Sequence, residues 1–513
     1  MPEPLKIDGK EIKMEKSARF LGVIFDSRLN WAEHINYLVE KCNKRLNCMR
    51  AIAGTKWGAN RKLLLMLYRG LIRSVLDYGS IAFNSASAHI KAKLDVIHHK
   101  ALRKAAGAFK TTANAALEVE LCEPPLSIRR KQLTLKYAVK VLGTPNHPAA
   151  PAFQQQAINN RRIQTVSKTA QDFLASANVI FHGPRYDAAA KPPWLRKQCT
   201  VDTSLTAVLN TSYGDQIKKA LACDVIDRYG HCLHYYTDGS RLEDGRTAAA
   251  VYSPATDSSI AARLTDKISI YAAELTAIRL ALEWAQQVST DNSNEIVIFS
   301  DSLSSLISLQ AGHCASRPNL LEDVLQFIDR LEPRVHLVWL PSHCGIFGNE
   351  KADKSANGAT RRATVDLHVG YELDDGYSKV KSYIINEWQK QWTRCKTGAF
   401  LRHISPTVNK PLRPCLQNRA KDVLITRLRF GKCKLNSYLA QIRKAPNADC
   451  KYGCRSPETV EHFLMHCSSA GNPVSGKLKM ACQTLGLLHD LKTVLTDARL
   501  IVIITSARLD RDL

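Results

Sequence analysis

The chain of 513 residues is strongly basic, with 72 Lys and Arg residues against 47 Asp and Glu residues and a net charge of +25. Hydrophobic residues make up 45% and charged residues 23%, which excludes a disordered or fibrous chain, and the length suffices for about three domains. No apolar run reaches the roughly 18 residues of a membrane-spanning helix, and the N-terminus lacks the apolar core of a signal peptide. The 15 cysteines follow no regular framework, so we expect a reduced protein of the cytoplasm or nucleus that binds nucleic acid rather than a membrane.

The charge is unevenly distributed along the chain. Residues 231–360 contain 10 Lys and Arg residues against 16 Asp and Glu residues, whereas the remainder contains 62 against 31. Basic flanks that neutralise phosphates around an acidic centre that collects cations suit a metal-dependent nuclease. A solvated surface explains the same charges equally well, so the motifs must decide.

Residues 1–145 are predicted to form a basic, mainly helical region. A short strand is expected at Phe20–Asp26, and apolar residues at helical spacing predict the helices that follow it. Their approximate bounds are Trp31–Ala53, Arg61–Tyr78, Ala88–Phe109 and Ser127–Leu142.

This region resembles the thumb and connection that follow the polymerase palm in reverse transcriptases of non-LTR retrotransposons. The run from Phe20 to Trp31, the following His34 and the sequence Leu76-Asp-Tyr-Gly-Ser80 carry the resemblance. No Tyr-X-Asp-Asp box occurs, and Asp77 does not replace it because a polymerase needs paired carboxylates. We therefore expect a basic scaffold or hybrid-binding surface without DNA synthesis, unless a separate chain supplies the palm.

Residues 146–230 are predicted to be a linker. Repeated prolines and a polar, weakly periodic composition disfavour long helices there. Short helical pieces are expected within it, among them Gln164–Ala177.

Residues 231–360 show the alternation of strands and helices that predicts an α/β domain with a mixed five-stranded sheet and flanking helices. The predicted strands are Cys232–Thr237, Thr247–Ser253, Ser258–Leu264, Glu295–Ser300 and Arg334–Leu340. The predicted helices are Tyr271–Gln287, Ser302–Ala311, Asn319–Leu331 and a last helix that Asn349 caps.

Four carboxylates are placed at the ends of these elements. Asp238 follows the first strand, Asp301 follows the fourth, Glu274 lies early on the first helix and Asp353 lies in the first turns of the last helix. If the first and fourth strands are neighbours, these side chains meet at one end of the sheet. Carboxylates gathered there repel one another and tend to protonate, and divalent cations relieve the repulsion. The pattern therefore predicts metal ligands, although a solvated loop position explains any single Asp.

His343 precedes Asp353 by ten residues and lies in a loop with Gly345 and Gly348. An imidazole near a scissile phosphate is able to transfer protons to water or to the leaving group. Taken alone, a histidine in such a loop is more often an ordinary surface residue.

These residues resemble the type 1 ribonuclease H family. The motifs Thr-Asp238-Gly-Ser, Glu274-Leu, Ser-Asp301-Ser and Pro-Ser-His343-X-Gly-X-X-Gly-Asn-Glu-X-Ala-Asp353 occur in the family's order. The resemblance implies a ribonuclease H-like fold that cleaves the RNA strand of RNA–DNA hybrids. It implies that Asp238, Glu274, Asp301 and Asp353 bind two Mg²⁺ ions, with Mn²⁺ as an alternative, and that His343 transfers protons. The competing interpretation is a catalytically silent nucleic-acid-binding relic.

Residues 361–513 are predicted to form a basic, mainly helical tail. The helix at about Tyr377–Thr393 carries an apolar and aromatic stripe, which is either buried core or a surface for base stacking. Beyond Leu485 we expect a helix followed by a short apolar strand.

The tail also contains a candidate zinc site at 450–467. Cys450, Cys454, His462 and Cys467 have the ligand types and the closeness of a structural zinc site, with His466 as a rival to His462. The segment resembles the cysteine–histidine region that ends many non-LTR reverse transcriptases. Ordinary reduced thiols are the alternative.

Overall fold

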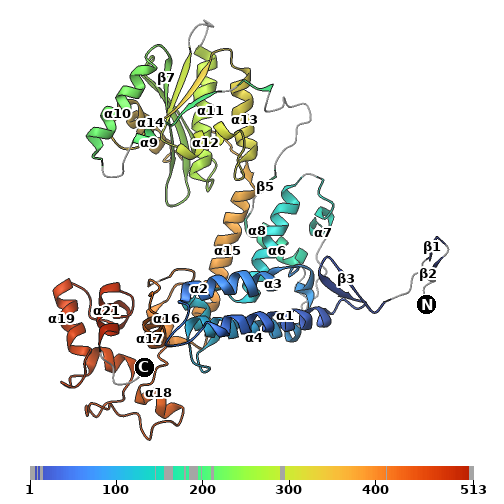
Figure 1. The fold of residues 1–513 in the computed structure, drawn as a ribbon. Coiled ribbons are helices and arrows are strands. Elements are labelled where there is room, and N and C mark those ends of the chain that lie inside the picture. The colour runs from blue at the N-terminus through green and yellow to red at the C-terminus, as the bar shows by residue number, and fades with distance from the viewer. Residues whose placement is uncertain are drawn as a thin grey trace. The chain divides into compact units, whose positions relative to one another are not determined.

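The chain folds into two compact units, each assembled from segments that are distant in the sequence (Figure 1). The first unit comprises Met1–Tyr137, Ala152–Ser176 and Val380–Leu513, and the second comprises Ala138–Pro151 and Ala177–Lys379. The computed structural model describes residues 6–8, 10–11, 15–144, 146–154, 166–177, 181–183, 195–197, 199–208, 213–288, 295–411 and 413–507.

The second unit is built around a mixed sheet. Its strands are β6 (Thr200–Asp202), β7 (Leu233–Arg241), β8 (Thr247–Ser253), β9 (Ser258–Leu264), β10 (Ile296–Ser300) and β11 (Val335–Trp339). Their order across the sheet is β6-β11-β10-β7-β8-β9. The pairs from β6 to β7 are parallel, and the pairs from β7 to β9 are antiparallel. A separate parallel pair joins β5 (Phe181–His182) to β12 (Tyr371–Glu372).

The predicted α/β class and mixed sheet are confirmed, but the sheet has six strands rather than five. The additional strand is β6, which lies inside 146–230, the segment predicted to be a linker; part of that segment lies outside the described residues. Three residues, Thr-Val-Asp, are too few to show a periodicity, so only their pairing with β11 reveals the strand. The first predicted strand is also longer than expected, because β7 continues through Asp238 to Arg241.

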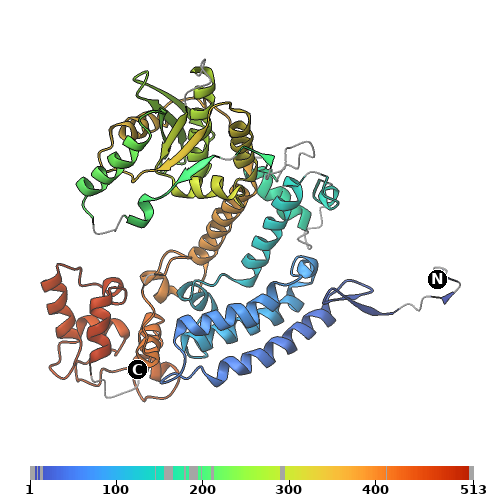
Figure 2. The same ribbon diagram turned by 45° about the horizontal axis from the view of Figure 1, so that its top comes forward.

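Helices cover both faces of this sheet, as Figures 1 and 2 show. One face packs against α11 (Ile270–Val288), α12 (Leu303–Ala311) and α13 (Pro318–Arg330), and the other packs against α9 (Leu205–Val208), α10 (Asp215–Arg228) and α14 (Phe347–Ala359). Successive strand residues point to opposite faces. Tyr235 and Ile298 therefore enter the first core, while Tyr236 and Phe299 enter the second.

The first unit is mainly helical and contains both ends of the chain. Four of the helices named next cross its boundary, and their residues 138–143, 150–151, 177 and 373–379 belong to the second unit. From the N-terminal part come β1 (Lys6–Ile7), β2 (Lys10–Glu11), β3 (Ser17–Phe20), β4 (Val23–Asp26), α1 (Ala32–Ala51), α2 (Arg61–Leu67), η1 (Tyr68–Arg73), α3 (Ser74–Asp77), η2 (Ala82–Ser85), α4 (Ala88–Ala106), α5 (Asn114–Glu120), α6 (Leu126–Gly143), α7 (Ala150–Gln154) and α8 (Val166–Ala177). From the C-terminal part come α15 (Leu373–Arg394), α16 (Ala399–Ile404), α17 (Arg419–Arg429), α18 (Asn436–Gln441), η4 (His462–His466), α19 (Ser475–Leu485), α20 (Leu491–Val494) and α21 (Ala498–Ser506).

Two local predictions differ from the structure in this unit. The strand expected at Phe20–Asp26 is a hairpin of β3 and β4, because Leu21 and Gly22 turn the chain with φ angles of 46° and 83°. The apolar strand expected beyond Leu485 is the helix α21, whose residues Leu500, Ile501 and Ile504 are buried in the core of the tail. Tertiary packing decides between helix and strand for such short apolar runs.

The aromatic stripe of α15 belongs to the core. Trp388 and Trp392 are 3% and 1% exposed, and the Nε1–H of Trp392 donates to the carbonyl of Ser405 at 2.9 Å. Indoles buried in this way do not offer faces on which bases can stack.

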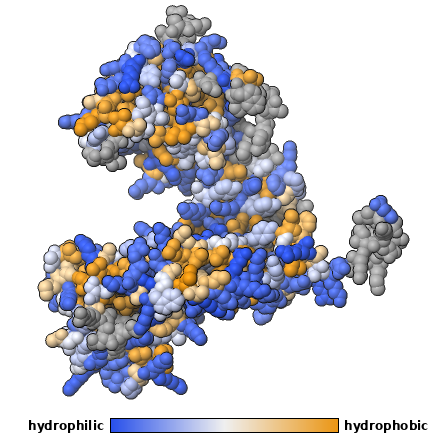
Figure 3. Space-filling view, viewed as in Figure 1, coloured by the Kyte–Doolittle hydropathy of each residue, from blue (hydrophilic) through white to orange (hydrophobic). Residues whose placement is uncertain are grey.

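Among the described residues, no helix combines the length and the apolar content that crossing a bilayer requires. Hydrophilic and hydrophobic side chains intermingle over the face of each unit that Figure 3 shows.

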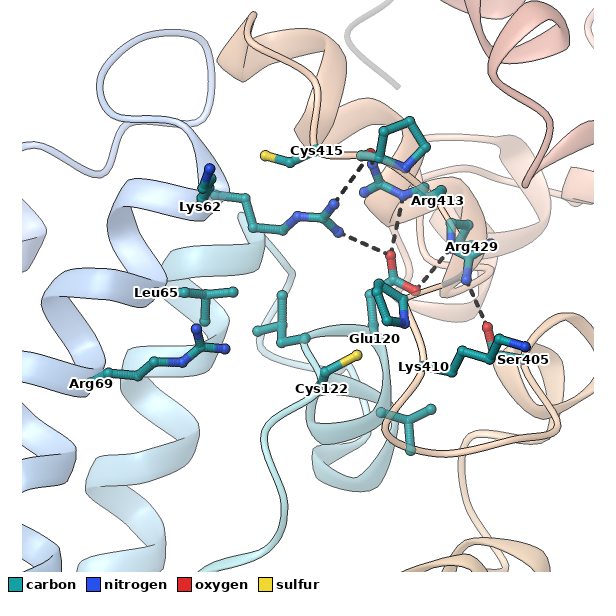
Figure 4. A pocket seen from close by; sticks show the side chains of 15 residues that line it. Lys62, Leu65, Arg69, Glu120, Cys122, Ser405, Lys410, Arg413, Cys415 and Arg429 are labelled. Atoms are coloured by element: carbon teal, nitrogen blue, oxygen red, sulfur yellow. Dashed lines mark hydrogen bonds and ion pairs between the residues drawn. The ribbon is translucent and has the colours of Figure 1, made fainter. Parts of the chain in front are cut away.

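A buried ion network within the first unit joins the C-terminal tail to the N-terminal helices. In Figure 4 the Glu120 carboxylate at the end of α5 lies against Arg413 and Arg429, both from the tail. Its oxygens lie 3.2 Å from Nε of Arg413, 2.8 Å from Nε of Arg429 and 3.3 Å from Nη1 of Arg61 on α2. Asp422 of α17 lies 2.8 Å from Arg413 and 3.4 Å from Arg61. Burial alone would raise the pKa of Glu120, but the charges of the three arginines outweigh it and lower the pKa.

We expect Glu120→Gln to destabilise the first unit by about 3–5 kcal/mol, because removing one partner leaves buried arginines without compensation. Hydrogen exchange in α5 and α17 should accelerate, while exchange in β7 and β10 of the second unit should not change. Glu387→Gln is the matched control, because Glu387 is partly exposed beside Lys131 and its loss should cost at most about 1 kcal/mol. Equal exchange rates in the two variants would show that the network does not hold the unit together.

Candidate active site

Strand pairing brings Asp238 and Asp301 together. Strands β7 and β10 are parallel neighbours, and Ser300 lies opposite Thr237. The residues that follow these two in sequence, Asp301 and Asp238, are therefore adjacent at the same end of the sheet. This is the neighbour relation on which the predicted site depends.

Helix α11 supplies Glu274, and Gly239 permits its close approach. A Cβ atom on Gly239 would lie 2.7 Å from the backbone nitrogen of Glu274 and 2.9 Å from the carbonyl carbon of Ala273. Any side chain at this position would therefore push α11 away from β7. With glycine there, the Gly239 backbone N–H donates to the Glu274 carboxylate.

The three carboxylates form a compact buried cluster. One oxygen of each of Asp238, Glu274 and Asp301 lies within 4.8 Å of the others. Asp238 and Glu274 are each only 7% exposed. Oδ2 of Asp238 and Oε2 of Glu274 are buried and have no hydrogen-bond partner. Such orphaned acceptors are rare in proteins and indicate a missing positive partner.

The electrostatics of the cluster agree with its geometry. Burial, followed by the charges of Asp301 and Asp353, raises the pKa of Asp238 to about 8. Burial and the charges of Asp238 and Asp301 raise the pKa of Glu274 well above its usual value. Burial also raises the pKa of Asp301, although His343 and a hydrogen bond from Asn349 oppose the shift. The chain itself therefore does not compensate the negative charge that it concentrates here.

The structure places Asp353 and His343 beside the cluster rather than in it. The charges of both residues affect the pKa of Asp301. Neither residue contributes an atom to the group of oxygens that lie within 4.8 Å of one another. Oδ1 of Asp353 accepts a hydrogen bond from Nδ2 of Asn357 at 2.6 Å. His343 is exposed on a turn, with a left-handed φ of 50° that is unusual for a residue other than glycine.

Two amide side chains that the sequence analysis did not assign to the site support it. Asn349 was expected to cap the last helix, but α14 already begins at Phe347, so Asn349 is inside the helix and bonds Asp301. Asn357 links Asp353 to Ser240 of β7, whose hydroxyl donates to Asn357 Oδ1 at 2.6 Å. The Gly-Asn-Glu run of the motif could have indicated a site role for Asn349. No sequence pattern near Asn357 indicated such a role.

A second cluster of metal-ligand type lies in the tail. Cys450, Cys454, His462 and Cys467 each offer one atom, and these atoms lie within 4.8 Å of one another. His466 lies outside this set, with an exposed ring 3.8 Å from Glu461. The wide π-helical turn of η4 explains why His462 rather than His466 lies beside the cysteines. This turn is closed by a hydrogen bond that the Cys467 N–H donates to the His462 carbonyl at 2.8 Å.

The donor geometry of this cluster suits zinc. The three sulfur–sulfur distances are 3.3, 3.6 and 3.9 Å. A tetrahedral ion with Zn–S bonds of about 2.3 Å requires sulfurs about 3.8 Å apart. Nε2 of His462 is buried without a hydrogen-bond partner, as expected for a nitrogen that binds a metal.

Known proteins support the interpretation of the second unit. Residues 231–361 match the RNase H family. The chain is 29% identical over 136 residues to a retrovirus-related Pol polyprotein from the type-1 retrotransposable element R1 4 of Nasonia vitripennis, and 28% identical over 79 residues to the Pol polyprotein of element R1 from Bradysia coprophila. The matches cover 26% and 15% of this chain, and only 35% and 8% of those relatives. Residues 231–361 therefore form a ribonuclease H domain, in a chain whose relatives are Pol polyproteins of R1 retrotransposable elements.

Proposed function

We propose that the second unit hydrolyses the RNA strand of RNA–DNA hybrids with two divalent cations, Mg²⁺ or alternatively Mn²⁺. The observation that carries this proposal is the buried cluster of Asp238, Glu274 and Asp301 with its two orphaned oxygens. Only oxygen donors face one another there, and oxygen donors are what hard cations prefer. Cations also offset the burial and the charge repulsion that together raise the pKa of Asp238.

The chain's own residues hold and orient the reacting groups. Asp238, Glu274 and Asp301 are proposed as metal ligands, and Asp353 as a fourth ligand that Asn357 keeps in position. When bound, the two cations supply a water of lowered pKa and neutralise charge on the scissile phosphate. The parallel pairing of β7 and β10 keeps the ligands on a rigid edge, so binding requires little rearrangement.

His343 is proposed to transfer a proton to the leaving 3′-oxygen. Its exposure on a turn beside Asp301 leaves the ring free to approach a bound strand. Protonation of that oxygen leaves a 3′-hydroxyl on one product and a 5′-phosphate on the other. The 2′-hydroxyls of the RNA strand distinguish a hybrid from duplex DNA in the wide minor groove. We place this activity in the cytoplasm or nucleus, where free thiols such as the 15 of this chain persist.

Asp301→Asn should lower the rate of hybrid cleavage by at least about 100-fold, because a metal ligand contributes several kcal/mol. The measurement is cleavage of a labelled RNA–DNA hybrid by the full chain with Mg²⁺. Asp224→Asn is the matched control, because Asp224 is exposed on α10 and should leave the rate unchanged. Hybrid binding by the unmodified chain without cleavage would instead favour the silent nucleic-acid-binding relic.

Asp238→Asn should make the metal-free protein more stable at pH 8 while abolishing cleavage. The folded pKa of Asp238 is about 8, above its unfolded value, so the penalty for ionising it is absent below about pH 4 and grows as the pH rises towards 8. The amide avoids this penalty, which corresponds to a gain of at least about 2 °C in the melting temperature.

Melting curves at pH 5 and pH 8, with and without Mg²⁺, test this prediction. The stabilising effect of Mg²⁺ on the unmodified chain should be larger at pH 8. A variant that melts at a lower temperature than the unmodified chain at pH 8 without metal contradicts the electrostatic interpretation.

We propose in addition that Cys450, Cys454, His462 and Cys467 bind a structural zinc ion. The near-tetrahedral sulfur spacing and the orphaned His462 nitrogen support the proposal. Phe463 and Leu464 of η4 are buried in the core of the tail, so an ion that holds this turn also holds the core.

Cys454→Ser should remove about one zinc ion per chain and accelerate hydrogen exchange in η4 and α19. Cys48→Ser is the control, because Cys48 is an exposed thiol on α1. Metal content and exchange are measured on the full chain after dialysis. Unchanged zinc content in the Cys454→Ser variant would refute this assignment.

A further inference from the structure

A second feature of the first unit is a pocket in which more than half of the lining residues are cationic. It lies where the C-terminal ends of α1 and α4 meet the loops that follow them, and its volume is about 290 Å³. Five of its nine lining residues are basic and none is acidic: Arg50, Lys100, Arg103, Lys104 and Lys110. This pocket is distinct from the one in Figure 4, which contains Glu120.

The positive charge of the pocket is not compensated by the chain. In the part of the chain that the structure describes, no carboxylate forms an ion pair with Lys100, Lys104 or Lys110. Arg50 bonds only the neutral amide of Asn47, at 2.8 Å. Like charges held this close repel one another unless an anion lies between them.

Arg103 provides a fixed donor at this site. Its Nη2 donates to the carbonyl of Thr112 at 3.1 Å and to the side chain of Asn114, which holds the guanidinium in place. Its Nε–H is buried and has no acceptor. Burial lowers the pKa of Arg103, since no acidic group stands beside it. A guanidinium held with an unused donor suits an oxyanion.

The last backbone carbonyls of helix α4 are not available to the lysines of the pocket. Helix C-termini carry partial negative charge on their last carbonyls, which would attract nearby lysines. Here two arginines from the tail already occupy those carbonyls. Arg419 donates to Lys104 and Ala105 at 2.9 and 2.7 Å, and Arg427 donates to Gly107 at 3.0 Å. The tail helix reaches them because Gly107 has no side chain; a Cβ there would lie 2.5 Å from Val423.

We propose that this pocket binds a phosphate group of a nucleic-acid backbone. A phosphodiester supplies the oxyanion that the unused Arg103 donor and the unpaired lysines require, and a strand offers several phosphates to the several cations of the pocket. Such a contact recognises the charge of the phosphates and not the identity of the bases, so DNA and RNA strands should both bind. The pocket thus gives the first unit a strand-binding role that does not depend on cleavage by the second.

The test compares two triple variants of the full chain that remove the same charge. The pocket variant carries Lys100→Gln, Lys104→Gln and Lys110→Gln, which remove three positive charges from the pocket. Arg103 is left unchanged, because its hydrogen bonds to the following loop support the fold. Lys396→Gln, Lys477→Gln and Lys479→Gln are the control, because these lysines are exposed elsewhere in the same unit. Both variants should unfold at the same denaturant concentration as the unmodified chain.

The probe is a short labelled single-stranded DNA, measured over a range of salt concentrations without divalent metal. The pocket variant should bind at least about tenfold more weakly, and its slope of log affinity against log salt should fall by about 2, since each phosphate contact to a single strand contributes about 0.7. The control should change affinity by less than about threefold. Because the readout requires no cleavage, a silent nuclease site does not affect it.

Inorganic phosphate distinguishes a strand from a free anion. Its binding to the unmodified chain and to the pocket variant is measured against sulfate at equal ionic strength. Phosphate binding that the pocket variant loses, together with unchanged DNA affinity, would assign the pocket to a free anion and overturn the proposal. Equal loss of DNA affinity in the two triple variants, or no loss in either, would overturn it as well.

Discussion

Repulsion among buried carboxylates is the constraint on which the second unit depends. Asp238, Glu274 and Asp301 are held within 4.8 Å of one another, and two of their oxygens lack any partner in the protein. A fold that only needed stability would not concentrate acids in this way, since burial already raises the pKa of Asp238 to about 8. The sheet and α11 overcome the repulsion by packing, and the residual charge supports our proposal that cations bind at this edge of the sheet.

The first unit uses buried charge differently. Around Glu120 and Asp422 the arginines outnumber the acids, so each carboxylate has partners and the network joins segments from both ends of the chain. Close to the end of α4 the basic residues have no such partners, and the positive charge remains available to a ligand. Charges that are paired within the protein thus hold segments of the chain together. Charges of either sign that lack a partner in the protein lie where we propose that ligands bind.

This separation of charge underlies the complementary roles that we propose for the two units. An acidic edge that attracts cations and a basic surface that attracts phosphates need not compete within one chain, because they are built on different units. In the functions that we propose, the positive charge of the first unit raises the local concentration of nucleic acid, and the second unit cleaves a bound hybrid. The proposed zinc site lies in the same tail that supplies Arg419 and Arg427 to the end of α4.

Much of the fold and the candidate site was determined by the sequence alone. Helical spacing in α1, the short apolar run of β10 and the order of the four acidic motifs are local properties, so the α/β class and the identity of Asp238, Glu274 and Asp301 follow from them. Only the tertiary structure decided features that depend on distant residues. These include the strand β6, the helical state of α21, the bond from Asn349 to Asp301, the choice of His462 over His466 and the packing of Val423 against Gly107. Each arises from contacts between segments that are remote in the chain, and no local periodicity encodes such contacts.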